Sequence, residues 1–342
     1  MPLSHAPSLR ELARSVGFSH TPVSEALRGN PRVKESTKKR IIEAAAAAGY
    51  RHNPLAGALM SEMRRSRAST FRGVLAIIDI DGPGRRPATA APYHEGLSHG
   101  ATTRAAELGF KAEEIVIGKR GISVPRLDTI LRSRGIRGLL VLPASDPPEL
   151  ARLDWTNYAG VYADFLIEHP ALNALCSDHY RSMTTALQRL HSLGYRRPGL
   201  VMEHRHDERL LHRWEAAYDA YQKHHEGIVC APSFIVPHYT KETFLAWFKS
   251  AKPDVVLCHR ADVIGWMESC GAKVPETHGF CCLNISLNSI PCAGLDLQPD
   301  VIGARAVELI IAQIYRNEYG IPSIPTTTTI PSRWVDGPTL NR

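Results

Sequence analysis

Residues 8–30 of the chain read SLRELARSVGFSHTPVSEALRGN, and this stretch decides the fold of the amino-terminal part. Ser8 and Glu11, three residues apart, form a capping box and predict the start of a helix. The apolar side chains of that helix recur at helical spacing, and we expect them to be buried: Leu9, Leu12, Ala13 and Val16. Gly17 is expected to end the helix.

A second short helix follows directly. Ser19 can cap it, and Pro22 is tolerated because the N–H groups of a first turn have no partner inside the helix. Val23, Ala26 and Leu27 have the spacing of an inward face. The polar side chains left on the outward face are His20, Thr21, Ser24 and Arg28. Two short helices joined by a turn containing glycine predict a helix-turn-helix, whose second helix enters the major groove of DNA.

A third helix is expected over about residues 35–48, with Gly49 as its stop. It supplies the side chains that complete a small core: Ile41, Ile42, Ala45 and Ala48. Four polar residues around it are candidate phosphate contacts, which position such a module without reading bases: Lys34, Thr37, Lys38 and Arg40.

The charge distribution agrees with a nucleic-acid partner for this part of the chain. Residues 1–72 hold 13 Lys and Arg against 5 Asp and Glu, whereas the remaining 270 residues hold 28 against 29. A basic head that binds a polyanion, carried on a neutral body, explains this asymmetry. The alternative from charge alone is a solvated basic surface.

The composition indicates a cytoplasmic protein that needs no metal or cofactor. The 342 residues contain no apolar run long enough for a membrane span and no signal peptide at the start. The seven cysteines form no C-x-x-C pair, so we interpret them as reduced, buried side chains, with metal ligation as the alternative. The 16 histidines show no zinc-binding spacing.

Residues 53–61 predict a short helix that is unstable alone. Asn53 can cap it with Pro54 at its first position, and an apolar side includes Leu55 and Leu59. Helices of fewer than about 12 residues are marginal in water, so this one should form only against a partner. The basic segment RRSRAST, residues 64–70, is expected to link it to the body.

From residue 73 the pattern changes to strands alternating with helices, which predicts two doubly wound α/β lobes. The β-rich runs of the first series are residues 73–80, 111–118, 138–144 and 159–167, with a helix-length stretch at 93–110. A second series has β-rich runs at 173–178, 197–204, 233–237, 254–259 and 278–285, and helices at 179–193, 213–225 and 261–270. A ligand between two such lobes contacts the carboxyl edges of both sheets. No dinucleotide fingerprint follows the first strand.

Residues 8–54 as a whole resemble the DNA-binding head of the lactose-repressor family of bacterial transcription regulators. The resemblance lies in the Gly-hydrophobic-Ser turn, the VS pair of the second helix and the GY-x-x-N exit. It implies that two copies of the helix after Asn53 pair over the minor groove, with Asn53 and Ala56 near DNA and Leu59 inserted between base pairs. The alternative for Leu59 is an ordinary core position. Pro22 and Glu25 replace the family's usual Thr and Arg, so an operator sequence cannot be transferred.

The resemblance extends to the body through residues 176–201, 293–314 and the RWVDG segment at 333–337. It implies a periplasmic-binding-protein-like body with a helix-turn-helix head at 1–49 and a hinge helix and linker at 50–72. The N-terminal lobe would comprise 73–166 and 293–318, and the C-terminal lobe 167–292 and 319–342. The candidate effector-binding residues are Tyr93, Asp164, Asp178, Arg209, Trp214, His259, Arg260 and Asn284.

The proposed effector pocket departs from the family pattern in its charge. LCHRAD, residues 257–262, brings His259 and Arg260 to the pocket wall, and Asn284 stands where relatives have an aspartate. The loss of one carboxylate and the presence of His259 and Arg260 make the pocket more positive. This favours a sugar acid, a phosphorylated sugar or another anion over a neutral hexose as the effector. For Asp178 and Arg260 the alternative is an ordinary salt bridge.

These observations predict a homodimeric, sequence-specific transcription regulator, most simply a repressor, that binds operator DNA and is controlled by a small molecule, a sugar or sugar derivative, between two lobes. The alternative is a cytoplasmic small-molecule-binding protein of the same fold without a gene-regulatory role. No nucleophile elbow, Walker loop or kinase motif occurs, which argues against an enzyme.

Overall fold

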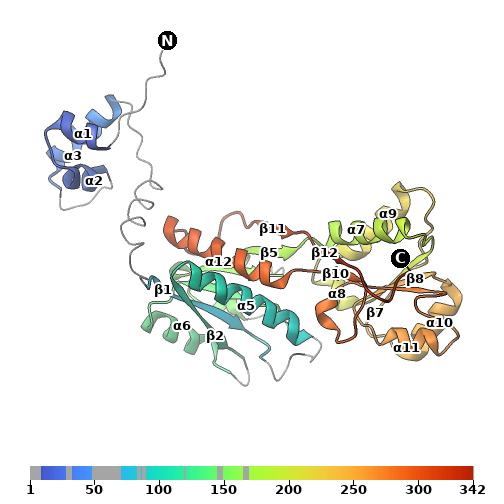
Figure 1. Ribbon diagram of the computed structural model, residues 1–342. Helices are drawn as coiled ribbons and strands as arrows, with labels where there is room; N and C mark the ends of the chain where they lie inside the picture. Colours follow the sequence, from blue (N-terminus) through green and yellow to red (C-terminus); the bar gives the residue numbers. More distant parts are fainter. Residues whose placement is uncertain are drawn as a thin grey trace, which may run out of the picture. The chain divides into compact units, whose positions relative to one another are not determined.

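The computed structural model describes residues 9–27, 33–47, 71–82, 86, 90–118, 121–144, 149–164 and 169–341; in the first helices, the side chains of residues 9–11, 20, 21 and 24 lie outside the description. The chain divides into two compact units, Met1–Thr70 and Phe71–Arg342 (Figure 1). We call them the head and the body and describe each by itself.

The head contains three helices: α1 Leu9–Val16, α2 His20–Leu27 and α3 Glu35–Ala47. Gly17 has φ +72° and its N–H donates to the Arg14 carbonyl, which ends α1 at the predicted glycine. Arg40 fastens α3 to the end of α1, because its guanidinium donates to the Val16 carbonyl at 2.7 Å. The buried core of the head consists of Leu12, Ala13, Val16, Val23, Ala26, Ile41 and Ala45.

One predicted member of this core is wrong. Ile42 is 46% exposed, whereas its neighbour Ile41 is completely buried. Consecutive residues of a helix point about 100° apart, so α3 can turn only one of the two side chains toward α1 and α2. The inward face of α3 continues from Ile41 to Ala45, with Ala44 packed beside it.

The first sheet of the body has six strands in the order β11-β5-β4-β3-β1-β2, and all its pairings are parallel. Its strands are β1 Gly73–Asp79, β2 Phe110–Val116, β3 Gly138–Val141, β4 Ala159–Ala163, β5 Asn173–Ser177 and β11 Thr327–Ile330. The register of β1 against β2 runs from Gly73 opposite Phe110 to Asp79 opposite Val116. Its helices are α5 Ala91–Glu107, α6 Val124–Ser133 and α12 Pro299–Arg316. Without β11, the order 2-1-3-4-5 is that of a doubly wound sheet.

The second sheet repeats this order as β12-β10-β9-β8-β6-β7, with only the β10–β12 pair antiparallel. Its strands are β6 Pro198–Glu203, β7 Phe234–Val236, β8 Val255–Cys258, β9 Gly279–Cys282, β10 Gly294–Asp296 and β12 Arg333–Val335. Its helices are α7 His179–Ser192, α8 His204–Glu208, α9 Arg213–His224, α10 Lys241–Ala251 and α11 Val263–Glu268. Figure 1 shows the two sheets as the two halves of the body.

The boundary between the lobes differs from the predicted one. Residues 173–178 were expected to open the second series, but β5 pairs with β4 in the first sheet. Likewise, β11 joins the first sheet and β10 the second. The reason is physical: a run such as NALCS is apolar and buried on both faces, and nothing in such a pattern says which sheet it joins.

The chain passes between the lobes three times, at residues 177–179, 296–299 and 330–333. These crossings are bonded to one another. The Asp178 N–H donates to the Ile330 carbonyl at 2.8 Å, and the Gln298 amide donates to the Pro331 carbonyl at 2.7 Å. Arg333 and Asp296 form an ion pair at 2.8 Å. The three segments therefore make one connected junction.

Helices α5 and α12 cross at very close range because glycines lie between them. A Cβ atom on Gly100 would lie 1.9 Å from the Asp300 carbonyl oxygen, and one on Gly303 would lie 2.0 Å from the Leu97 oxygen. Both clashes are with backbone atoms, which cannot rotate away. The crossing therefore requires the absence of a side chain at these positions.

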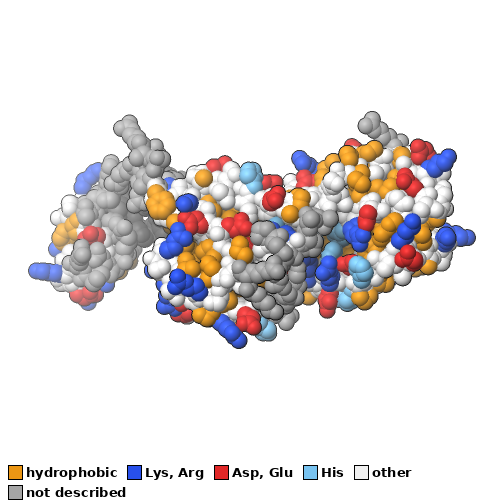
Figure 2. Space-filling model, turned by 90° about the horizontal axis from the view of Figure 1, so that it is seen from below, with side chains coloured by type: hydrophobic (Ala, Val, Ile, Leu, Met, Phe, Trp, Pro, Cys, Tyr) orange, Lys and Arg blue, Asp and Glu red, His pale blue; other side chains and the backbone are white. Residues whose placement is uncertain are grey.

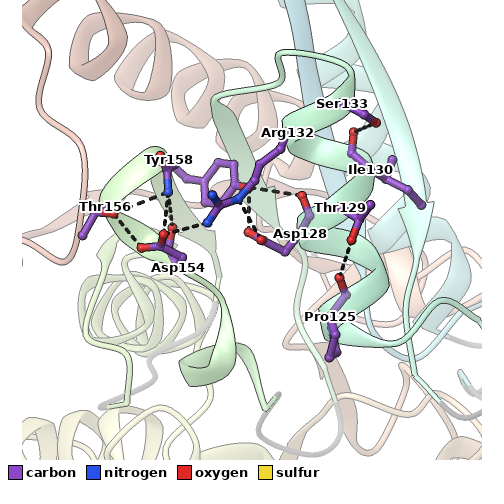
Figure 3. Close-up of polar contacts among 10 residues, drawn as sticks. Pro125, Asp128, Thr129, Ile130, Arg132, Ser133, Asp154, Thr156 and Tyr158 are labelled. Atoms are coloured by element: carbon purple, nitrogen blue, oxygen red, sulfur yellow. Dashed lines mark hydrogen bonds and ion pairs between the residues drawn. The ribbon is translucent and has the colours of Figure 1, made fainter.

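A polar network on the surface of the first lobe ties α6 to the start of β4 (Figure 3). The Arg132 guanidinium pairs with Asp128 at 2.8 Å and with Asp154 at 2.7 Å, and the Tyr158 hydroxyl donates to Asp128 at 2.8 Å. Exposed ion pairs of this kind contribute little free energy of folding. Their effect is to fix the direction in which β4 enters the sheet.

Candidate functional site

The head presents a helix-turn-helix with basic side chains at its surface. Lys34 is exposed, and its carbonyl accepts the N–H groups of Thr37 and Lys38 at the start of α3. Lys39 and Arg14 are also exposed. Arg40, expected at phosphate, instead bonds the Val16 carbonyl and lies over the Phe18 ring at 5.0 Å. Its guanidinium is thus partly committed to holding the head together.

The predicted DNA-binding residues fall into three groups. Ser19 and Lys34 are exposed just before α2 and α3, and Thr37 is half-buried in the first turn of α3. His20, Thr21 and Ser24 lie on α2, but their side chains are not described. The predictions outside the described residues are Ser8, Arg28, Asn53, Ala56 and Leu59.

In the body, polar side chains from both lobes meet where the chain crosses between them, and we call this set the junction cluster. It is built from the carboxyl ends of strands in both sheets, where doubly wound folds place their ligand sites. Its members are Tyr93, Asp164, Ser177, His179, His206, Arg209, Trp214 and His259. Five of these are among the eight predicted effector residues.

Asp164 is the carboxylate at the centre of the junction cluster. It directly follows β4, is 4% exposed and has φ 49°. Its oxygens accept the Tyr93 hydroxyl at 2.7 Å and the Ser177 N–H at 2.7 Å, and His179 lies 3.8 Å away. Burial alone would raise the pKa of this carboxyl, but the hydrogen bonds from Ser177 and Tyr93 and the positive charge of Arg209 hold it below its usual value. Asp164 is therefore ionised.

Three imidazoles and one indole continue the cluster into the second lobe. Trp214, at the start of α9, contacts His179 with ring centroids 5.0 Å apart and His259 with centroids 5.8 Å apart. His259 in turn contacts His206 of α8 at 5.5 Å. On the face shown in Figure 2, histidine side chains gather on the second lobe near the junction.

Burial, reinforced by neighbouring positive charges, lowers the pKa of each imidazole and favours its neutral form. Arg209 contributes to this lowering in all three. For His206 the resulting pKa is about 4. The Nδ1 atoms of His179 and His259 are buried and have no hydrogen-bond partner among the described residues. Most buried polar atoms in proteins are hydrogen-bonded, so these two nitrogens are the unsatisfied polar atoms of the cluster.

The other three predicted effector residues contact partners outside this cluster. Asp178 caps α7 by accepting the Arg181 N–H, and Asp178 also takes part in the crossing to β11. Arg260 pairs with Asp262 and lies over the rings of Tyr239 and Trp266. Asn284 is buried and caps a short 3-10 helix, η4 Ile285–Leu287. That helix lines an open groove of about 460 Å³ together with Pro92 and Pro299.

Sequence reasoning missed Ser177, His179 and His206. The first two flank Asp178, the residue that was selected, so the error was one position in register. Because alternate residues leave a strand end in opposite directions, that one position decides which side chain faces the junction. His206 belongs to HRHDE, residues 204–208, where the density of polar residues was the available signal.

The neutral imidazoles predict a loss of stability in mild acid. An unfolded histidine titrates near 6.5, whereas folded His206 titrates near 4, so the unfolded chain takes up the proton first. Stability is complete above pH 6.5 and falls as the pH drops toward 4. Between pH 7.5 and 5, His206 should account for about 1 to 2 kcal/mol, allowing for its partial exposure.

Urea unfolding at these two pH values measures this loss. His206→Gln should reduce the difference between them, whereas His224→Gln, at an exposed site, should not. An equal pH dependence in the wild type and His206→Gln would contradict the assignment.

Three side chains that can ligate a metal ion lie next to the junction cluster. Asp207, His212 and Glu215 offer ligand atoms within 4.8 Å of one another. Both Asp207 oxygens, however, already accept backbone N–H groups, those of Trp214 and Glu215, at the start of α9. The carboxylate has a structural task there as the cap of that helix.

None of the described helices combines the length and apolar character that crossing a bilayer requires. No curated protein sequence matches the chain significantly. Two family models match: residues 8–53 fit the bacterial regulatory proteins of the lacI family, and residues 187–340 fit the periplasmic binding protein-like domain.

Solved structures of regulators share the fold. A transcriptional regulator CelR in complex with cellobiose is 17% identical, with a TM-score of 0.58, covering 97% of this chain and 99% of that one. The lac repressor dimer bound to operator is 16% identical, with a TM-score of 0.57, covering 98% and 100%. A lacI-family regulator from Silicibacter pomeroyi is 19% identical, with a TM-score of 0.53, covering 100% of both chains.

The model that matches the head describes a DNA-binding domain, and the model that matches the body describes a binding-protein-like domain. The chain therefore joins a lacI-type DNA-binding domain to a periplasmic-binding-protein-like domain.

Proposed function

We propose that the protein is a cytoplasmic, homodimeric repressor that binds a pseudo-palindromic operator and changes its affinity when a small molecule binds at the junction cluster. The observation that carries this proposal is the pairing, in one chain, of a basic helix-turn-helix head with a two-lobed body. A two-fold symmetric dimer matches two half-sites on DNA.

Support for the DNA half comes from the exposed basic residues beside α2 and α3. Ser19, His20, Thr21, Ser24 and Arg28 are the proposed contacts of the recognition helix, and Lys34 and Thr37 are proposed at phosphates. Asn53, Ala56 and Leu59 are the proposed minor-groove residues, with Leu59 as the wedge between base pairs.

Lys34→Ala should weaken binding to operator and to random DNA by similar factors. A phosphate contact carries no sequence information, and its loss should reduce the slope of log affinity against log salt by about one for each half-site. Fluorescence anisotropy across a salt series measures both quantities. Lys241→Ala, which removes an exposed lysine of the body, is the matched control. A loss confined to operator DNA would instead assign Lys34 to base recognition.

Support for the effector half comes from the composition of the junction cluster. It joins a buried carboxylate, hydroxyls, imidazoles, a guanidinium and an indole face from both lobes, a mixture suited to a hydroxylated ligand. The solved CelR regulator carries cellobiose, and by analogy we propose a sugar or sugar derivative for this chain. Ligand binding that favours one arrangement of the lobes changes DNA affinity by the coupling free energy, typically about 1 to 3 kcal/mol.

Selection of duplexes from a random library by the full-length protein tests the proposal. We expect an enriched site with two-fold symmetry and a dimer in sedimentation measurements. Enriched sites without symmetry, or no enrichment over random DNA, would refute it.

A further inference from the structure

We propose that the small molecule recognised at the junction cluster carries an oxyanion, a carboxylate or a phosphate, which binds Arg209 and the imidazoles of His179 and His259. This inference rests on the proposed function and names the ligand class of the same site. It concerns the charge of the ligand, which the sugar analogy leaves open.

The geometry leaves two buried imidazole nitrogens without partners among the described residues, and these nitrogens donate to an oxyanion when the rings are protonated. His179 is 2% exposed, yet its Nδ1 has no hydrogen-bond partner among the described residues, and the same holds for the Nδ1 of His259. The two rings pack against the same indole, that of Trp214, at 5.0 and 5.8 Å. The two rings and the indole therefore form one connected group, and we infer that one ligand contacts both rings. Leaving such groups buried and unpaired costs about 1 to 3 kcal/mol each, which a bound ligand recovers.

The carboxylates around the cluster already accept hydrogen bonds, whereas one guanidinium has no partner among the described residues. Each carboxylate near the imidazoles is already engaged: Asp164 by Tyr93 and Ser177, Asp207 by the start of α9, and Glu203 by His238 at 2.7 Å and Arg205 at 3.2 Å. Arg209, by contrast, is exposed and forms no hydrogen bond or ion pair with any residue that the structure describes. Its guanidinium is the charge that an incoming oxyanion can neutralise.

The same charges make binding depend on protons. The positive charge of Arg209 lowers the pKa of all three imidazoles, that of Arg213 also lowers the pKa of His179, and that of Arg205 also lowers the pKa of His206. The opposing groups are Asp164 and Asp207 toward His179 and Glu203 toward His206. A bound oxyanion favours the protonated imidazole, so binding should take up protons and tighten as the pH falls from 8 to 6. A neutral sugar has no such effect.

Thermal unfolding of the full-length protein with sodium sulfate as the probe tests the anion site directly. At equal ionic strength, 10 mM sulfate should raise Tm by several degrees over chloride, and more at pH 6 than at pH 8. Arg209→Gln should abolish the difference, whereas Arg189→Gln, at an exposed site on α7, should retain it. The same shift in Arg209→Gln as in the wild type would overturn the proposal.

Calorimetry with matched sugars then identifies the source of the oxyanion. D-glucuronate or D-glucose 6-phosphate should bind at least tenfold more tightly than D-glucose, with proton uptake revealed by buffers of different ionisation enthalpy. The acid that binds distinguishes carboxylate from phosphate. Tighter binding of D-glucose, or equal binding of all three, would overturn the anionic assignment while leaving the regulator intact. Failure of the proposed function would appear separately, as absent operator selection.

Discussion

Ile41→Asp should abolish operator binding, lowering affinity at least 100-fold, while the body stays folded. The Ile41 side chain is completely buried between α1, α2 and α3. Removing a buried isoleucine costs about 2 to 5 kcal/mol, and an unpaired carboxylate in its place costs several more. A three-helix unit of this size has only a few kcal/mol of stability, so the head should unfold. Anisotropy with selected operator DNA and circular dichroism measure the two effects.

The neighbouring residue provides the control. Ile42→Asp makes the same chemical change one position along α3, at a side chain that is 46% exposed. It should retain the fold and at least most of the operator affinity, apart from the modest repulsion of an added negative charge near DNA. Equal losses in the two variants would mean that the head does not pack as described.

Gly100→Ala adds a single methyl group, yet it should cause a large loss of stability in the body. The added Cβ atom would lie 1.9 Å from the Asp300 carbonyl oxygen and 2.6 Å from its Cα, so helices α5 and α12 must move apart. Overpacking of this kind costs about 2 to 4 kcal/mol, equivalent to a Tm decrease of roughly 5 to 10 °C for a body of this size. Scanning calorimetry of the full-length protein measures the decrease.

Gly265→Ala is the matched control for that substitution. Gly265 is an exposed residue of α11, and a Cβ atom there would meet nothing within 4 Å. Alanine is the better helix former by about 1 kcal/mol, so this variant should be slightly more stable than the wild type. A Gly100→Ala protein as stable as Gly265→Ala would contradict the close crossing of α5 and α12.

The fold was predictable from the sequence where residues nearby in the chain determine whether a side chain is buried or a helix ends. Gly17 at the end of α1 and the inward spacing of Val23 and Ala26 are properties of single helices, and both were predictable. The place of β5 was not, because strand pairing depends on which distant segment arrives beside it. Ile42 shows the limit within a helix: two adjacent isoleucines are equally apolar, and only the packing of α1 and α2 selects one.

The junction cluster was predictable in part for a related reason. Asp164, Arg209 and Trp214 were found by their positions relative to a family pattern, which conveys three-dimensional placement that composition lacks. Arg260 illustrates the opposite case. It follows His259 directly, but its side chain pairs with Asp262 and lies over the rings of Tyr239 and Trp266. The free Nδ1 atoms of His179 and His259 are properties of the assembled site alone.

The three bonded crossings between the lobes have a mechanical consequence. Hydrogen bonds and an ion pair connect segments 177–179, 296–299 and 330–333. We therefore expect the lobes to rotate about these connected segments more easily than they slide past each other. His179 is the last residue of the first segment, and its Nε2 lies 3.8 Å from an oxygen of Asp164 on the other lobe. A molecule bound to these side chains would lie close to the axis of that rotation. Small displacements at the binding site would therefore become large displacements at the outer ends of both lobes.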